Sequence, residues 1–207
     1  MFHEILSTLI LGFLIGLTGA LAPGPTLVAT INASLTGTWT TGLKISLGHI
    51  LAEAVIFVLI VMGLAAVAAP YTSVIAGIGG IALISFGIMT IAGSRSATIT
   101  LSGATVVANP YAAGLITSVA NPYFWIWWLS IGSSMVIAGL EGGLVLAGIF
   151  MIGHWTADTG WFTVVSTSVS RGKTILSDRA YQGGMALCGL FLLLFGAYYL
   201  SRLLGPL

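Results

Sequence analysis

The sequence predicts an all-α membrane protein with six transmembrane helices, built as two inverted-topology repeats of three helices each. Of its 207 residues, 57% are hydrophobic and only 5% are charged, whereas soluble domains carry about 25% charged residues. The hydrophobic residues form six long runs, and a series of short motifs occurs twice in the same order. A water-facing surface cannot be built from so few charged residues. The hydrocarbon of a membrane must therefore be the solvent for most of the protein's surface.

The six apolar runs define the predicted spans. At about 20 residues for each crossing, the chain holds six spans and short connectors in a single membrane domain, residues 1–207. The N-terminus has no basic segment, so the first run is interpreted as a span and not as a cleaved signal peptide. The spans are Ile5–Ala22, Thr41–Val67, Tyr71–Ala92, Tyr111–Ala138, Gly142–Ser166 and Tyr181–Leu203, and the polar connectors include Asn32–Thr40, Gly93–Pro110 and Val169–Ala180.

Basic residues predict the orientation of the chain. In a six-span arrangement one side carries Lys44, Arg95, Arg171, Lys173 and Arg179, and Arg202 lies on the other side. Short cytoplasmic loops of membrane proteins are enriched in Lys and Arg. Both termini are therefore expected outside the cytoplasm.

The motif series predicts a repeat of residues 1–95 in residues 111–207. The first copy contains Ala22-Pro23, Gly48-His49-Ile50-Leu51-Ala52-Glu53, Phe86-Gly87 and Arg95. The second copy contains Ala120-Asn121-Pro122, Gly153-His154-Trp155-Thr156-Ala157-Asp158, Phe195-Gly196 and Arg202. An odd number of spans in each copy gives the two copies opposite orientations, a plan that many secondary transporters share.

Prolines are expected to break the first and fourth helices, at Pro23-Gly24-Pro25 and at Asn121-Pro122. Broken backbone inside a membrane is tolerated where protein or water covers it. Half-helices that start after each break would direct their positive N-terminal ends at a bound carboxylate. The residues predicted to bind substrate are Pro23, Gly24, Pro25, Thr26, Asn32, Asn121, Pro122 and Trp125, the last as a wall or gate of the cavity.

Two pairs of ionisable residues lie inside predicted spans. His49 and Glu53 are four residues apart on the second span, and His154 and Asp158 are four apart on the fifth, so each pair shares a helix face. Inverted symmetry would bring the pairs together. They can couple transport to protons, or serve as ligands of a divalent metal, and their spacing does not separate these roles.

Other classes of protein are disfavoured. The chain has no nucleophile–base motif outside the spans and its connectors are too short for a catalytic domain, so no enzyme and no cofactor are expected. A net charge of +1 gives no nucleic-acid footprint, and the single cysteine, Cys188, rules out a disulfide framework. A homo-oligomer remains open.

The chain resembles the LysE/RhtB family of amino-acid exporters in its Ala22–Pro25 stretch, in Thr41–Gly48, in the Asn121-Pro122 break and in its size. The resemblance implies a multi-pass protein of a prokaryotic cytoplasmic membrane that exports amino acids or related small metabolites, with protons as the coupling ion. It also implies that both proline breaks belong to the central site. Thr26 departs from the family pattern, which continues with Asp or Asn. The wider superfamily includes heavy-metal exporters, so a divalent metal cation exporter is the alternative.

Overall fold

A computed structural model describes residues 2–22, 24–96, 109–172 and 177–201, and its regular structure there is entirely helical. This confirms the all-α prediction for the described residues. In chain order the elements are α1 Phe2–Ala20, α2 Pro25–Thr36, α3 Thr40–Val61, α4 Leu64–Ala68, the 3₁₀ turn η1 Ala69–Tyr71, α5 Thr72–Ser94, α6 Pro110–Val119, α7 Pro122–Trp127, the π-helical turn η2 Trp128–Gly132, α8 Ser133–Glu141, α9 Leu144–Gly172 and α10 Asp178–Ser201.

Five described helical segments are long and apolar enough to cross a membrane: Phe2–Ala20, Thr40–Val61, Gly77–Ser94, Pro122–Glu141 and Asp178–Ser201. The long helix α9 is not among them, although it has 29 residues. At 1.5 Å for each residue it extends about 44 Å, more than the roughly 30 Å of a hydrocarbon core. It has the length of a span, but His154, Asp158 and several hydroxyl residues reduce its hydropathy.

The helix breaks predicted at the prolines are present. α1 ends at Ala20 and α2 begins at Pro25, while α6 ends at Val119 and α7 begins at Pro122. Gly24 precedes α2 in an extended conformation, and the side chain of Asn121 accepts a hydrogen bond from the Tyr123 N–H at 3.0 Å. Both prolines take the first helical position, where a missing N–H costs least.

Several predicted boundaries are wrong, among them the fifth span's end at Ser166 and the start of the connector at Val169–Ala180, because α9 continues to Gly172. The second span was expected to reach Val67, but α3 ends at Val61 because Gly63 takes a left-handed φ of +103° and turns the chain. The connector expected at Asn32–Thr40 is helical as far as Thr36. Serine is common in loops, but the Ser34 hydroxyl donates to the Thr30 carbonyl of the preceding turn at 2.6 Å. Its hydrogen-bonding need is therefore met inside the helix.

Glycines let helices from the two halves of the chain approach closely. A Cβ atom on Gly48 of α3 would overlap the Tyr111 carbonyl oxygen of α6, and a Cβ on Gly153 of α9 would overlap the Leu9 carbonyl oxygen of α1. α1 therefore packs on α9, and α6 packs on α3. The equivalent glycines of the two G-H-x-x-A motifs thus make equivalent contacts, each with a helix of the other half.

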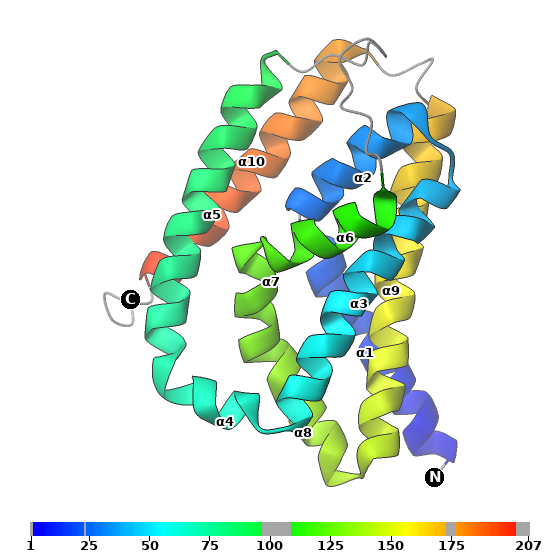
Figure 1. Cartoon of the computed structure of the whole chain (residues 1–207), viewed down its shortest axis with the longest axis vertical. Helices are drawn as coiled ribbons and strands as arrows, with labels where there is room; N and C mark the ends of the chain where they lie inside the picture. Colours follow the sequence, from blue (N-terminus) through cyan, green and yellow to red (C-terminus); the bar gives the residue numbers. More distant parts are fainter. Residues whose placement is uncertain (1, 23, 97–108, 173–176, 202–207) are drawn as a thin grey trace.

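α5 and α10 form a pair beside the remaining helices (Figure 1). Gly80 approaches Gly196, and Gly87 approaches Gly189. Rising residue numbers in one helix meet falling numbers in the other, so the two helices are antiparallel. The pair meets the rest of the molecule mainly through α7.

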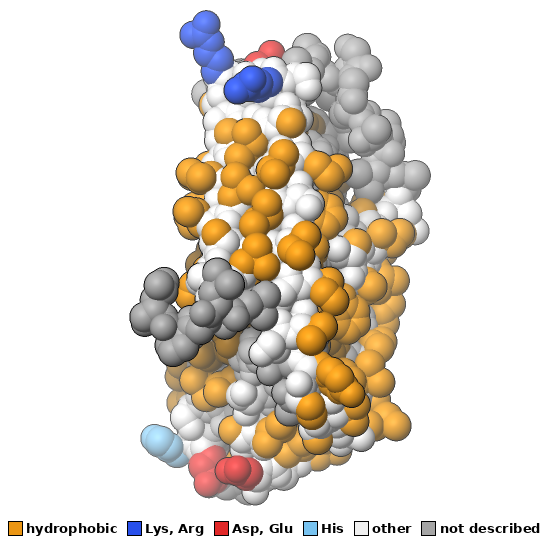
Figure 2. All heavy atoms as spheres, turned by 90° about the vertical axis from the view of Figure 1, so that its left-hand side faces the viewer, with side chains coloured by type: hydrophobic (Ala, Val, Ile, Leu, Met, Phe, Trp, Pro, Cys, Tyr) orange, Lys and Arg blue, Asp and Glu red, His pale blue; other side chains and the backbone are white. Residues whose placement is uncertain are grey.

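Apart from Glu53 and Asp158, the Lys, Arg, Asp and Glu side chains that the structure describes lie at the ends of the molecule. The start of α3, the ends of α5 and α9 and the start of α10 lie at one end (Figure 1), which places Lys44, Arg95, Arg171 and Arg179 there. Figure 2 shows Lys and Arg at this end, the His and most visible acidic side chains at the other, and hydrophobic side chains between them. Lys173 and Arg202, which the orientation prediction also used, are outside the described residues.

Candidate functional site

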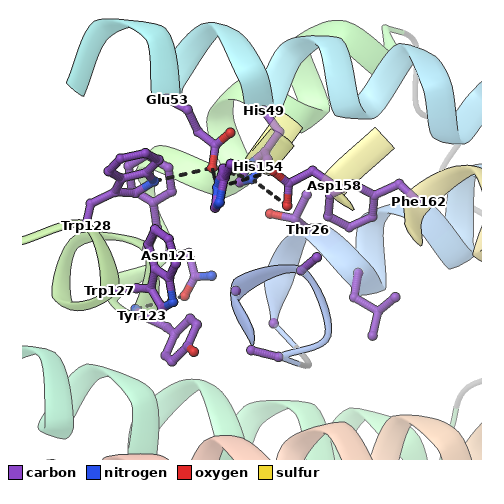
Figure 3. Close-up of a pocket in the computed structure, with 16 residues that line it drawn as sticks. Thr26, His49, Glu53, Asn121, Tyr123, Trp127, Trp128, His154, Asp158 and Phe162 are labelled. Carbon is purple, nitrogen blue, oxygen red and sulfur yellow. Dashed lines mark hydrogen bonds and ion pairs between the residues drawn. The ribbon is translucent and has the colours of Figure 1, made fainter. Parts of the chain in front are cut away.

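The four ionisable residues predicted from the motif series meet at the contact between α3 and α9 (Figure 3). Because each pair is spaced by four residues, one helix face presents both members. Glu53, His154 and Asp158 are each 1% exposed, and the His49 side chain is 13% exposed. Inverted symmetry was expected to bring the pairs together, and they do lie together in the interior.

One oxygen of Glu53 is the hub of this cluster. Glu53 Oε1 lies 2.9 Å from His154 Nε2 and 3.1 Å from His49 Nε2. Asp158 lies farther out, with Oδ2 3.3 Å from His154 Nε2 and Oδ1 3.9 Å from His49 Nε2. Both imidazoles therefore direct Nε2 at both carboxylates, which allows protons to be exchanged within the cluster.

The two histidines differ at Nδ1. His49 Nδ1 lies 2.6 Å from the Ser118 hydroxyl, which itself donates to the Gly114 carbonyl at 2.6 Å. A hydroxyl has one hydrogen, so His49 must donate from Nδ1 to Ser118. On His154, Nδ1 has no hydrogen-bond partner among the described residues. The residue that faces it on α1 is Gly16, which has no side chain; a Cβ added there would lie 2.9 Å from this nitrogen.

Aromatic side chains enclose the cluster. Trp128 donates from Nε1 to Glu53 Oε1 at 3.3 Å, and it is the first residue of the π-helical turn η2. The rings of Trp127 and Phe150 lie 4.9 and 6.3 Å from the His154 ring, and Phe162 lies 5.7 Å from His49. An apolar wall of this kind lowers the local dielectric constant and strengthens each electrostatic interaction inside it.

A cavity joins this cluster to both helix breaks. Its lining residues are Gly19, Ala20, Ala22, Gly24, Thr26, Leu27, His49, Glu53, Asn121, Tyr123, Phe124, Trp127, Trp128, His154, Asp158 and Phe162. The two breaks face each other, because a Cβ on Gly24 would lie 3.0 Å from Asn121 Nδ2. The cavity has about 40 Å³ of free volume, which is room for water and far below the 300–1,000 Å³ typical of ligand sites.

The remaining predicted binding residues do not line this cavity. Trp125 lies outside it and donates from its indole nitrogen to the Val119 carbonyl at 2.8 Å. Asn32 accepts a hydrogen bond from the Tyr181 hydroxyl. It lies in the second half of α2, toward the end of the molecule that carries Lys44 and Arg171, called the basic end below. Pro25 and Pro122 start the half-helices but are not among the lining residues. Pro23 is outside the described residues.

Several site residues were not predicted. Trp128 was passed over for Trp125, three residues earlier, because the π-helical turn that follows Trp127 leaves no mark in the sequence. Ser118 was also missed, because its equivalence to Gly16 shows only in the contacts of the folded chain. It precedes Pro122 and contacts His49 as Gly16 contacts His154, so the two positions are equivalent.

Three of the four ionisable residues also have the spacing of a cation site. One ligand atom from each of His49, Glu53 and Asp158 lies within 4.8 Å of the others. One imidazole nitrogen and two carboxylate oxygens suit several divalent metals. The same geometry therefore permits either proton exchange or the passage of a metal ion.

The sequence was compared with known proteins. A family model described as LysE type translocator matches residues 17–202. Neither a curated protein nor a solved structure was found that matches the chain.

Proposed function

Because the chain belongs to the LysE type translocator family, we propose that it is a secondary active transporter that exports amino acids or related small metabolites across the cytoplasmic membrane. The family consists of multi-pass membrane transporters, not enzymes, and the apolar helices fit that setting. The observation that carries the proposal is a single buried cavity lined by both helix breaks and by four ionisable side chains.

The cavity has one pole for each charge of an amino acid. At the break before α2, a 12-residue helix presents its first N–H groups and the positive end of its dipole beside Gly24 and Thr26. This pole suits a carboxylate. Glu53 and Asp158 supply the negative pole for the ammonium group. The N–H groups of α2 and the two carboxylates would then fix both ends of the substrate.

Protons are proposed as the coupling ion. Glu53 Oε2 is a buried oxygen without a hydrogen-bond partner among the described residues, and Asp158 Oδ2 has only the ion-pair contact with His154 Nε2 at 3.3 Å, which lacks hydrogen-bond geometry. Such an oxygen is costly as part of a carboxylate and less so when it carries a proton. Binding a proton and binding the ammonium group are then alternative ways to neutralise the cluster. That competition would link proton entry to substrate release.

Alternating access would come from two inverted repeats, residues 1–95 and 111–207, that rock around the site. The reciprocal contacts of Gly48 with Tyr111 and of Gly153 with Leu9 support this repeat. The small cavity also supports it, because a substrate can enter only when helices separate on one side. We include α9 as the sixth span.

The basic end of the molecule is proposed to face the cytoplasm. Lys44, Arg95, Arg171 and Arg179 share that end, as the six-span arrangement requires. The enrichment of Lys and Arg in cytoplasmic loops then places both termini outside.

Transport by reconstituted protein tests this function. Glu53→Gln and Asp158→Asn keep the shape of each side chain but remove its charge. Each is expected to lower proton-driven efflux from proteoliposomes by about 100-fold, which corresponds to roughly 2.7 kcal/mol in the barrier. Glu141→Gln, at an exposed residue at the end of α8, is the matched control and should transport like the wild type. Wild-type rates in both cavity variants would disprove the coupling role.

A divalent metal cation is the second candidate substrate, because ligand atoms of His49, Glu53 and Asp158 lie close together. A metal exporter would bind a divalent cation such as Zn²⁺ in detergent solution and lose that binding in a His49→Ala, His154→Ala double variant. Calorimetric titration of both proteins, together with metal efflux, decides between the two substrates. Amino-acid efflux without metal binding would exclude this candidate.

A further inference from the structure

An apolar groove lies between α1, α2 and α10. It has about 370 Å³ of free volume and is lined by Thr18, Leu21, Ala22, Leu27, Leu187, Cys188, Phe191 and Phe195. Its single hydroxyl, on Thr18, donates to the Ile15 carbonyl at 2.6 Å and is therefore occupied. The groove presents hydrocarbon, aromatic rings and a buried thiol to any occupant.

The groove adjoins the polar cavity. Ala22 and Leu27 line both spaces, so these two side chains form the wall between them. Leu27 is 8% exposed and follows the break by two residues. A movement of the α1–α2 break that turns Leu27 aside would merge the two spaces.

Other walls of the cavity have less room to yield. Gly16 of α1 lies against the backbone of His154 on α9, and Gly48 of α3 lies against that of Tyr111 on α6, so each of these two helix pairs is in close backbone contact. Trp127, Trp128 and Phe124 pack on one another in the core behind the cavity. The wall formed by Ala22 and Leu27 has a groove of about 370 Å³ directly behind it.

We propose that this groove receives the side chain of the transported amino acid, and that the substrates are amino acids with aliphatic or aromatic side chains. The inference rests on the proposed function, in which the polar cavity holds the carboxylate and ammonium groups. The cavity of about 40 Å³ must enlarge even for these two groups, and the wall of Ala22 and Leu27 is the one with free space behind it for a side chain. Burial of an apolar side chain in the groove is favourable, in proportion to the area removed from water.

The same groove selects against charged side chains. None of its lining residues carries a charge, and its one hydroxyl already donates to a carbonyl. An ammonium or carboxylate at the end of a substrate side chain would lose its hydration there without gaining a partner. Lysine and glutamate are therefore expected to be poor substrates, and leucine and phenylalanine good ones.

Competition in proteoliposomes tests the groove. Leu187→Trp puts a large ring into the groove from α10, at a residue distant in sequence from the polar cavity. Leu190→Trp makes the same change three residues later on the same helix, at a residue that does not line the groove and is about as exposed, 47% against 55% for Leu187. Exchange of labelled alanine is measured against unlabelled leucine, phenylalanine, alanine and lysine in all three proteins.

In the wild type, leucine should compete at least about tenfold better than lysine, a ratio of the size that one apolar pocket supplies. Leu187→Trp should weaken competition by leucine about tenfold relative to competition by alanine. Leu190→Trp should keep the wild-type ratio between the two competitors. Equal competition by lysine and leucine would overturn the inference. An equal loss of competition by alanine and by leucine in Leu187→Trp would also overturn it. So would an unchanged leucine-to-alanine competition ratio in this variant, which is the result expected if a lipid chain fills the groove. The proposed function would survive these results, and fails only if wild-type protein exchanges no amino acid.

Discussion

At the scale of single residues, Ser118 and Gly16 make the two central histidines different. The Ser118 hydroxyl fixes a proton on His49 Nδ1, while Gly16 offers His154 Nδ1 no partner. His49 then gains and loses its second proton at Nε2, which faces both carboxylates. Because its ring is held in one orientation, His49 exchanges protons only through Nε2, toward the two carboxylates. This makes it a better candidate for a proton carrier than His154.

Ser118→Ala removes the acceptor that holds the His49 ring. Loss of a buried hydrogen bond of this kind costs about 1–3 kcal/mol, and we expect the efflux rate to fall roughly tenfold because the ring is no longer oriented. Efflux from proteoliposomes at a constant proton gradient measures this.

Ser46→Ala is the matched control for Ser118→Ala. Ser46 is equally buried on α3, but its hydroxyl donates to the Leu43 carbonyl of its own helix at 2.9 Å. Its removal should leave efflux within about twofold of the wild type. If the two variants lose activity equally, Ser118 acts on packing and not on His49.

At the scale of helices, close backbone contacts at glycines position the ionisable residues. His154 follows Gly153 directly, and Gly153 lies against the Leu9 carbonyl of α1. His49 follows Gly48, which lies against the Tyr111 carbonyl of α6. Each motif therefore joins a helix contact to an ionisable side chain, and a shift of the contact moves the site.

Gly153→Ala should destabilise the protein, because the new methyl group has no space beside the Leu9 carbonyl. Overpacking of this kind costs about 1–3 kcal/mol. Gly148→Ala lies on the same helix with open space around it, and should be neutral or stabilising by up to about 1 kcal/mol through helix propensity. Thermal unfolding in detergent micelles compares the two. Equal melting temperatures would contradict the close contact.

At the scale of the whole molecule, this conformation is closed around its site. Between the cavity and the basic end, the hydroxyl oxygens of Ser34 on α2 and Ser166 on α9 lie 3.0 Å apart. Ser166 also donates to the Thr38 carbonyl at 2.8 Å. A substrate that enters from the basic end needs α2 to move away from α9.

A disulfide between these helices should lock the transporter. With Cys188 replaced by Ala, the Ser34→Cys, Ser166→Cys double variant has its two side chains close enough for a bond. Oxidation is expected to lower efflux by about tenfold or more, and reduction should restore it. The corresponding single variants control for the substitutions. Full activity in the oxidised protein, with cross-linking verified by mass spectrometry, would show that α2 and α9 stay together.

The sequence by itself predicted the helical class, both helix breaks and the residues of the central cluster. Few charges, long apolar runs and prolines are local signals, and the repeated G-H-x-x-A motif placed His49, Glu53, His154 and Asp158 on corresponding helix faces. It also predicted that Gly24, Thr26 and Asn121 lie at the site, and they line the cavity with these four. The chain's membership in its family was correctly inferred.

The tertiary structure decided which neighbours complete the site. Trp128, not Trp125, reaches Glu53, because a π-helical turn begins at that residue. Ser118 reaches His49 because α6 packs on α3. The apolar groove exists because α10 stands beside α1 and α2. Sequence patterns record which face of a helix is polar, but the separation and rotation of helices follow from contacts between residues far apart in the chain.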